Sequence, residues 1–455
     1  GNRRNLVWAE LGSAPLAYAV EYLACLADTT QKNLAAGTVD DLTAGYCSYG
    51  WQADDSVLRA LAQVENSADI DAVTTAIRAI YLPWAEESAR YLQQLVDNAS
   101  YPGGTCETAK AIAFTSGDCV FFVDGLRFDA GKRLRRALEA VGLTVSEKPF
   151  WAALPSVTAT GKAAVTPVRD RICGREGSLD FEPSVADTGQ SLKGGYPLKK
   201  LLDDAGWSIL DRSAVGDGQG KAWCECGDID HEGHNRGWKL AKHLDALIAE
   251  IAARIRELVT AGWKRIRVVT DHGWLLVPGG LPKTDLPGAL TDNRWGRCAA
   301  LKTGAMSEER LFPWFWNSSQ YFALADGVSC FRKGEEYTHG GLSLQECLTL
   351  HLTVTPGEAV HAAAAIELTD VAWKGLRCTV AVDGNYAGLS LDIRSQAGNA
   401  LSSVVVSRKP LKENGTASVV VEDEELEGQE ATVVLIDSQG MLLAQYPTVI
   451  GGGDR

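Results

Sequence analysis

The sequence predicts an α/β core at residues 113–358, preceded by a helical region at 1–112 and followed by a β-sandwich at 359–455. Three observations predict this division. Apolar residues recur every three or four positions before residue 110, as in amphipathic helices. Short apolar runs alternate with helical segments in the middle of the chain. Short alternating strands separated by Gly, Asn and Asp turns follow residue 358. A chain of 455 residues is also too long for one hydrophobic core.

The helical spacing of the N-terminal region is clearest at residues 14–27, 54–64 and 69–99. Ser67 and Asp69 are start signals for the third of these helices. The YPGG sequence at 101–104 then breaks the pattern.

Two strands of the predicted core end on acidic turns. The apolar run from Cys119 to Val123 stops at Asp124, and the strand-like IRVVT sequence stops at Asp271. A helical segment follows the first strand and a long amphipathic one precedes the second, which indicates a sheet with helices on both faces. Ligands of such sheets bind beyond the carboxyl ends of the strands, where both acids are expected to lie.

Composition limits the class of protein. The formal net charge of −14 argues against a protein that coats DNA unaided, although bound divalent metals would offset part of it. Basic clusters at 132–136, 199–200 and 264–267 are more simply solvated helix faces or loops. The sequence contains no apolar run long enough to span a membrane. The odd number of 11 cysteines favours reduced thiols, and we therefore expect a cytoplasmic protein.

Acids, imidazoles and a hydroxyl recur at the predicted strand ends: Asp124, Thr158, Asp230, His234, Asp271, His272 and His339. This is a suitable ligand set for two divalent metals, which accept mixed imidazole and carboxylate ligands. Two metals about 4 Å apart clamp the attacking and leaving oxygens of a phosphoryl displacement. Taken singly, each residue has a structural alternative: Asp124 as a helix cap, Thr158 as a loop residue, the histidines as hydrogen-bonded core residues.

The order of these motifs resembles the alkaline phosphatase superfamily, in its phosphodiesterase and cofactor-independent mutase branches. An early strand-end Asp124 is followed by Pro155-Ser156-Val157-Thr158, Asp230-x-x-x-His234, Asp271-His272-Gly273 and a late His339. The wording FFVDGLRFDAG, WAALPSVTATGKAAVTP, VVTDHGW and HGGLSLQE is similar to the PglZ family, the phosphatase of BREX phage-resistance systems. The resemblance covers residues 113–350 and implies an alkaline-phosphatase-like central sheet.

The resemblance also implies two metal sites, for which Zn²⁺ is the first expectation and Mn²⁺ the alternative. Their ligands would be Asp124, Thr158, Asp271 and His272 for one metal, and Asp230, His234 and His339 for the other. Thr158 would be the nucleophile, because a hydroxyl bound to a dication loses its proton readily. Ser156 remains an alternative nucleophile and His231 an alternative ligand.

Two cations close to the strand-end turns, Arg127 and Lys162, are candidates to hold a phosphate oxygen. Arg127 could equally be an exposed helix charge.

The expected function is a phosphodiesterase or phosphatase, or a nuclease, in a phage-defence system. Its substrate would be a nucleotide or nucleic acid, and its expected protein partner is a DNA methyltransferase. One alternative is a catalytically silent subunit that docks the methyltransferase. A second alternative is a mutase, which the short stretch between Thr158 and Asp230 disfavours because it leaves little room for a lid domain.

Overall fold

The chain folds into two compact units in the computed structural model, one of Gly1–Val141 with Val145–Thr355 and one of Gly142–Thr144 with Pro356–Arg455. The structure describes residues 15–452 except 109–112, 291–294, 303, 305, 307–309, 358–365, 385, 398, 400–401, 413, 438–439 and 441. The division into three domains stays a prediction.

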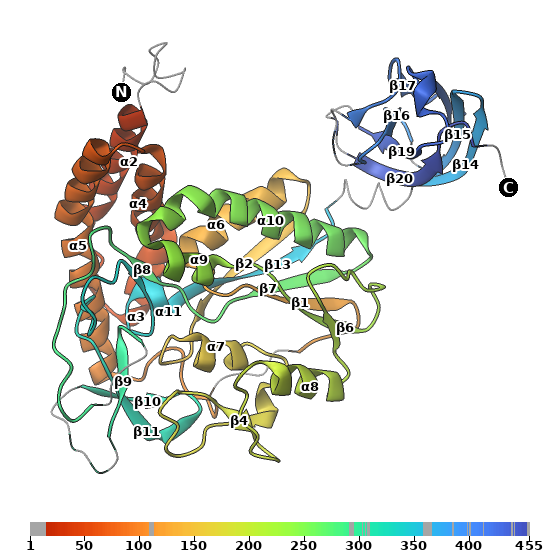
Figure 1. Ribbon diagram of the computed structural model, residues 1–455. Coiled ribbons are helices and arrows are strands. Elements are labelled where there is room, and N and C mark those ends of the chain that lie inside the picture. Colours follow the sequence, from red (N-terminus) through yellow and green to blue (C-terminus); the bar gives the residue numbers. More distant parts are fainter. Residues whose placement is uncertain are drawn as a thin grey trace. The chain divides into compact units, whose positions relative to one another are not determined.

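The N-terminal helices belong to the first unit (Figure 1). They are α2 (Pro15–Thr30), α3 (Val39–Gly45), the π-helical turn η2 (Tyr46–Gly50), α4 (Trp51–Gln63) and α5 (Ser67–Asn98). Ser67 is the first residue of α5 rather than its cap: the side chain of Asn66 accepts a hydrogen bond from the backbone N–H of Asp69. The sequence therefore located this helix start to within one residue.

A six-stranded sheet in the order β2-β13-β7-β1-β6-β5 forms the centre of the first unit. Its strands are β1 (Asp118–Phe122), β2 (Thr144–Trp151), β5 (Ser208–Leu210), β6 (Lys221–Glu225), β7 (Arg265–Val269) and β13 (Leu348–Thr355). β1 pairs in parallel with β6 and β7, and β5 pairs in parallel with β6, whereas β13 runs antiparallel to β7. In this register Phe122 lies between Glu225 and Val269, so three strands end at the same level.

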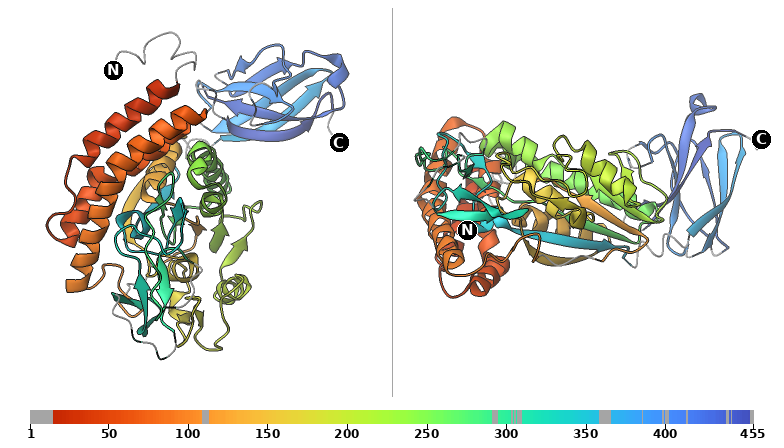
Figure 2. Two further views of the ribbon diagram at one scale, coloured as in Figure 1. Left: turned by 60° about the vertical axis from the view of Figure 1, so that its left-hand side comes forward. Right: turned by 90° about the horizontal axis from the view of Figure 1, so that it is seen from below.

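Helices cover both faces of this sheet (Figures 1 and 2), which confirms the predicted α/β class. On one side lie α6 (Phe128–Ala140) and α10 (Leu240–Thr260), and on the other lie α7 (Thr158–Ala164) and α8 (Tyr196–Asp204). The stripe Leu244, Ile248, Ile251 and Ile255 of α10 is buried, as its three- and four-residue spacing predicts.

Shorter elements surround the carboxyl edge of the sheet. Helix α9 (Ile229–Arg236) follows β6, and η3 (Arg169–Arg171), η4 (Gly237–Lys239) and α11 (Leu344–Cys347) are single turns. The short strands are β3 (Ile172–Cys173), β4 (Ser184–Val185), β8 (Leu275–Leu276), β9 (Cys298–Ala300), β10 (Leu311–Trp314), β11 (Asn317–Leu324) and β12 (Tyr337–Thr338).

The second unit consists of two antiparallel sheets that share one apolar core, which confirms the predicted β-sandwich. One sheet contains β14 (Ile366–Lys374), β15 (Arg377–Gly384) and β18 (Thr416–Val420). The other contains β16 (Ser390–Arg394), β17 (Lys409–Pro410), β19 (Glu430–Ile436) and β20 (Leu442–Val449). A 3-10 turn, η6 (Glu424–Leu426), precedes β19.

Neighbouring acids neutralise residues in two of the three basic clusters, those at 132–136 and 264–267. Lys132 contacts Glu147, and Arg133 contacts Asp55 at 2.6 Å. Arg265 pairs with the buried Asp118 at 2.7 Å. Such pairs support the reading of these clusters as structural. In the part of the chain that the structure describes, no helix is long and apolar enough to cross a membrane. All eleven cysteines are free thiols.

Candidate two-metal active site

The carboxyl edge of the sheet brings the predicted acids together. Asp124 follows β1, Asp271 follows β7, and Asp230 lies in the first turn of α9 after β6. Gly125 makes this approach possible, because it has φ +68° and an added Cβ would meet the Cβ of Asp230 at 3.0 Å. The glycine of the VDG turn therefore has a steric role.

The first cluster is centred on the buried imidazole of His272. Its Nε2 lies 3.1 Å from Oγ1 of Thr158, 3.6 Å from Oδ2 of Asp271 and 3.7 Å from Oδ1 of Asp124. The Nδ1 of His272 lies 3.0 Å from the carbonyl oxygen of Gly273, so Nδ1 donates and the Nε2 lone pair faces the cluster. These are the four residues that the resemblance assigned to one metal.

The second cluster adjoins the first. Nε2 of His339 lies 3.1 Å from Nε2 of His234, and each of these nitrogens is 3.5 Å from a carboxylate oxygen of Asp230. The Nδ1 of His339 donates to the carbonyl of Ser156 at 3.0 Å, which again leaves Nε2 as the free ligand atom. The rings of His272 and His339 stack with centroids 3.9 Å apart, so the two clusters share a boundary.

The chemistry of these groups fits divalent cations. Oδ2 of Asp271 is buried and has no hydrogen-bond partner among the described residues, a costly state for a carboxylate oxygen unless a cation binds it. Ligand atoms of Asp124, Asp271 and His272 lie within 4.8 Å of one another, as do those of Asp230, His272 and His339. Both groups are of the mixed carboxylate and imidazole type that Zn²⁺ and Mn²⁺ accept.

The pKa values of the residues in the two clusters also suit the binding of divalent cations. Burial raises the pKa of Asp271 to about 7, and burial together with the nearby carboxylates raises the pKa of Asp124 well above its usual range. For Asp230 burial also raises the pKa, but the neighbouring imidazoles, first that of His339, outweigh it and the net pKa is lowered. Burial lowers the pKa of His339 to about 4, so this ring is neutral, as a ligand must be, at neutral pH.

Thr158 begins α7, and two buried tryptophans fix that helix. The indole N–H of Trp314 donates to Oγ1 of Thr160, and that of Trp316 donates to the carbonyl oxygen of the same residue, both at 3.0 Å. Both rings are buried and form part of the core. By holding Thr160, the two tryptophans fix the first turn of α7 and with it the position of the candidate nucleophile Thr158.

The loop that carries His339 rests on a buried ion pair. The Arg297 guanidinium donates to both carboxylate oxygens of Glu346, and neither side chain is exposed. Glu346 also accepts hydrogen bonds from the backbone N–H of Gly341 and the hydroxyl of Ser343. The HGGLSLQE motif therefore supplies the acid that holds this loop in place as well as the histidine that it carries.

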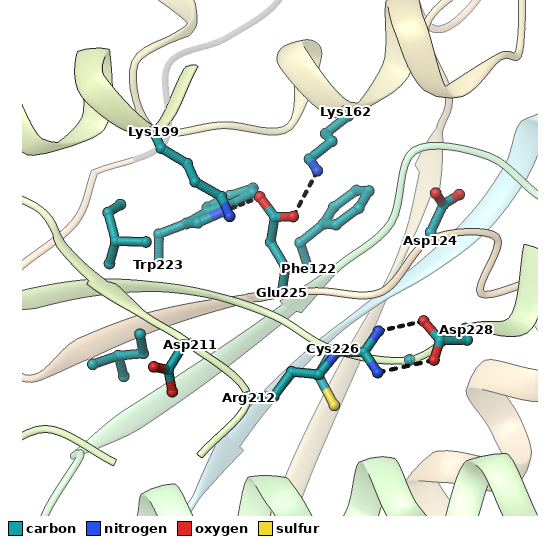
Figure 3. Close-up of a pocket in the computed structure, with 13 residues that line it drawn as sticks. Phe122, Asp124, Lys162, Lys199, Asp211, Arg212, Trp223, Glu225, Cys226 and Asp228 are labelled. Carbon is teal, nitrogen blue, oxygen red and sulfur yellow. Dashed lines mark hydrogen bonds and ion pairs between the residues drawn. The ribbon is translucent and has the colours of Figure 1, made fainter. Parts of the chain in front are cut away.

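Three other predicted residues are placed differently. The Arg127 guanidinium is buried, pairs with Asp129 at 2.6 Å and lies over the Trp274 ring at 3.7 Å, so it is not an exposed helix charge and is not free to hold phosphate. His231 is exposed and contacts Asn235, outside both clusters. Lys162 donates to Glu225 at 2.7 Å and lines a pocket with Asp124 (Figure 3).

Sequence reasoning missed Tyr337, whose hydroxyl donates to Oδ1 of Asp230 at 2.8 Å. Its signal was available in part. Tyr337 precedes His339 by two residues, a spacing at which side chains of an extended chain point the same way. The hydrogen-bond partner of Tyr337, however, is Asp230, which lies 107 residues earlier, and local sequence spacing does not predict such a contact.

The fold and site together define an α/β protein with a candidate two-metal centre at the carboxyl edge of its sheet. No protein-family model and no curated protein sequence matches the chain. The chain is similar to two solved structures of murine ectonucleotide pyrophosphatase/phosphodiesterase 5. The first, an inactive variant in complex with AMP, has a TM-score of 0.34 and 11% identity over 52% of this chain and 87% of the other. The second has a TM-score of 0.35 and 12% identity over 53% and 88%. Likeness at this level carries no argument about activity.

Proposed function

We propose that the protein is a two-metal-dependent phosphate-ester hydrolase of the alkaline phosphatase superfamily type, acting as a phosphodiesterase or phosphatase with Thr158 as its nucleophile. The observation that carries the proposal is the position of the Thr158 hydroxyl. It lies 3.1 Å from Nε2 of His272 and 3.5 Å from Oδ1 of Asp124, beside the orphaned oxygen of Asp271.

In this proposal Asp124, Thr158, Asp271 and His272 hold one divalent cation, and Asp230, His234 and His339 hold the other. Such cations lower the pKa of a bound hydroxyl and neutralise charge on the scissile phosphate. Oγ1 of Thr158 attacks phosphorus and releases the alcohol portion of the ester. Water then hydrolyses the threonine phosphoester and restores the hydroxyl. His272 and Asp124 orient Oγ1 for both steps.

The hydroxyl of Ser156 is a poorer nucleophile in this geometry. Its side chain is completely buried and donates to the carbonyl oxygen of Gly341 at 2.7 Å, which braces the His339 loop. A committed, solvent-inaccessible donor cannot approach phosphorus without disrupting that loop. His234 is favoured over His231 as a ligand because its Nε2 lies 3.1 Å from Nε2 of His339 and 3.5 Å from Oδ2 of Asp230, whereas His231 contacts Asn235. Lys162 is the remaining substrate-binding candidate, and Arg127 is not proposed for that role.

The biological setting is proposed from the sequence motifs alone. We place the protein in the cytoplasm, in a BREX-type phage-defence assembly with a DNA methyltransferase, with a nucleotide or nucleic acid as substrate. The net charge of −14 and the ion pairs within the basic clusters at 132–136 and 264–267 disfavour binding of duplex DNA without that partner. Co-elution of the full chain with a DNA methyltransferase in size-exclusion chromatography tests the assembly.

The proposed chemistry is tested by removing metals with a chelator and adding back Zn²⁺, Mn²⁺, Mg²⁺ or Ca²⁺ singly. Hydrolysis of bis-p-nitrophenyl phosphate and p-nitrophenyl phosphate is then followed in parallel. We expect metal-dependent turnover that falls by roughly 10³-fold or more in Thr158→Val, which removes the hydroxyl at nearly constant volume. Thr158→Ser, which keeps a hydroxyl, is the matched control and should retain measurable turnover.

The two substrates separate the possible outcomes. Turnover of the diester identifies a phosphodiesterase, and turnover of the monoester alone identifies a phosphatase. If metals raise the melting temperature but neither ester is hydrolysed, the proposal fails in favour of a structural subunit that binds metal.

A further inference from the structure

A pocket of about 370 Å³ adjoins the proposed metal centre (Figure 3). Asp124 forms one end of it, and the ends of β1, β5 and β6 supply its floor, including Phe122 and Trp223. Lys162 of α7 and Lys199 of α8 enter from the opposite side. The volume is at the lower end of the roughly 300–1,000 Å³ common for small-molecule sites. A substrate held at Asp124 would extend into this space.

The aromatic floor does not offer a free stacking surface. The Lys162 ammonium lies 4.9 Å from the centroid of the Phe122 ring, and the Phe122 and Trp223 rings stack on each other with centroids 5.8 Å apart. Both aromatic side chains are almost completely buried. The pocket is therefore suited to a polar group rather than to a nucleobase.

The carboxylates of the pocket already have partners. Glu225 accepts from Lys162 at 2.7 Å and from the Trp223 indole at 2.9 Å. Asp228 receives two hydrogen bonds from the Arg212 guanidinium. Asp211 accepts from two backbone N–H groups of its own turn, those of Ser213 and Ala214. These hydrogen bonds offset part of the negative charge of all three acids and so weaken their repulsion of a bound anion.

Lys199 differs from the other cations of the pocket. Its side chain is exposed, and within the part of the chain that the structure describes it forms no hydrogen bond or ion pair, although its charge helps to lower the pKa of Glu225. Its ammonium group points toward Glu225 and Trp223, into the pocket, as does that of Lys162 (Figure 3). Two ammonium groups, one of them without a hydrogen-bond partner among the described residues, thus face the space next to Asp124.

We propose that this pocket binds a second phosphate group of the substrate, held by Lys199 with support from Lys162, while the scissile phosphate lies at the metal centre. The inference rests on the proposed hydrolase function and narrows its substrate class. The preferred substrates carry two phosphate groups separated by a sugar, as in an oligonucleotide or a nucleoside bisphosphate. Glu225 accepts a hydrogen bond from Lys162 at 2.7 Å and so holds that ammonium group at the pocket.

The test compares two esters that differ only in the second phosphate. They are p-nitrophenyl thymidine 5′-phosphate and the same compound with an added 3′-phosphate. With the full chain and Zn²⁺, we expect a KM about tenfold lower for the 3′-phosphorylated ester, as one charge-assisted hydrogen bond supplies. Lys199→Ala should abolish this preference, so that the two esters have equal KM values. Lys200→Ala, which changes the adjacent exposed lysine outside the pocket, should keep it.

A binding measurement tests the affinity of the pocket for a second phosphate independently of ester hydrolysis. Isothermal titration calorimetry of the zinc-loaded chain should show tighter binding of thymidine 3′,5′-bisphosphate than of thymidine 5′-monophosphate, and Lys199→Ala should remove the difference. Equal KM values for the two esters and equal affinities for the two thymidine phosphates would refute the second phosphate site but not the proposed hydrolase function. Absent hydrolysis with a Lys199-dependent difference in affinity would support the pocket and overturn the proposed function.

Discussion

Tyr337 lies outside the two candidate metal clusters but contacts a residue of the second one. Its buried hydroxyl donates to Oδ1 of Asp230, and its ring packs against Trp274 with centroids 5.1 Å apart. Hydrogen bonds to a ligating carboxylate hold it in the orientation that the metal needs. Tyr337 therefore acts as a positioning residue for the second cluster.

Replacing Tyr337 with Phe removes this hydrogen bond and keeps the packing. We expect the affinity for Zn²⁺ to fall about 10-fold or more, the usual cost of losing such a partner. Competition with a fluorescent zinc chelator measures the change. Tyr321→Phe, at an exposed tyrosine of β11, is the matched control. Unchanged zinc affinity in Tyr337→Phe would show that Asp230 needs no support from this hydroxyl.

At the residue scale, the sequence predicted the members of the site better than their surroundings. The strand-end acids and the Asp230 to His234 pair converge because their positions follow from local spacing and strand ends. The position of Arg127 was not predictable in this way. Its partners include the backbone carbonyl of Asp54, 73 residues earlier, and the Trp274 ring, 147 residues later. The sequence left Arg127 open between a phosphate-binding cation and an exposed helix charge, and long-range packing instead buries it beside Asp129.

At the scale of elements, the edge of the central sheet contains a half-buried histidine. His351 of β13 stacks on Phe150 of β2 with centroids 4.0 Å apart, and its Nε2 atom is shielded and unpartnered among the described residues. Burial lowers the pKa of His351 to about 4. An unfolded chain would titrate this group near ~6.5.

The difference in pKa predicts acid sensitivity. Between pH about 6.5 and 4 the unfolded chain binds a proton that the folded chain excludes, so the free energy of unfolding falls as the pH falls through this window. The loss is at most about 3 kcal/mol, because the half-buried ring keeps some solvent contact. Urea denaturation of His351→Leu at pH 7.5 and 5 should show a smaller loss than the unmodified protein. His243→Leu, at an exposed histidine, should not. An equal loss in all three proteins would contradict this role.

The elements of the fold differ in how far they could be predicted. β1, β7 and α10 were predictable because apolar runs and helical spacing are local signals. The antiparallel placement of β13 and the small sheet β10-β11-β9 depend on pairings between distant segments, which local patterns do not encode. Asn66 was missed as a cap because Ser67 has equally favourable cap chemistry.

At the scale of the whole molecule, every residue of the proposed site and of the adjoining pocket lies in the first unit. The second unit has its own apolar core, built from residues such as Leu391, Val419 and Val433. A unit with its own core can fold independently. We therefore expect a chain that ends at residue 365 to keep metal-dependent hydrolysis within about threefold of the full chain, an effect of under ~1 kcal/mol on the barrier.

The truncation is informative only if the shortened protein folds, which its circular dichroism and zinc-dependent melting temperature establish. A folded, zinc-binding truncation without turnover would show that the β-sandwich contributes to catalysis. Binding of a DNA methyltransferase, measured on the full chain and on the truncated chain, would show which of the two units the proposed interaction requires.

The most direct test of the two-metal centre is a zinc titration of the metal-free chain, followed by turnover of bis-p-nitrophenyl phosphate. We predict that turnover rises until about two equivalents of Zn²⁺ are bound, since two clusters of ligands meet at the site. Thr158→Val should bind zinc and stay inactive. Turnover that saturates at one equivalent, or that survives in Thr158→Val, would contradict the account.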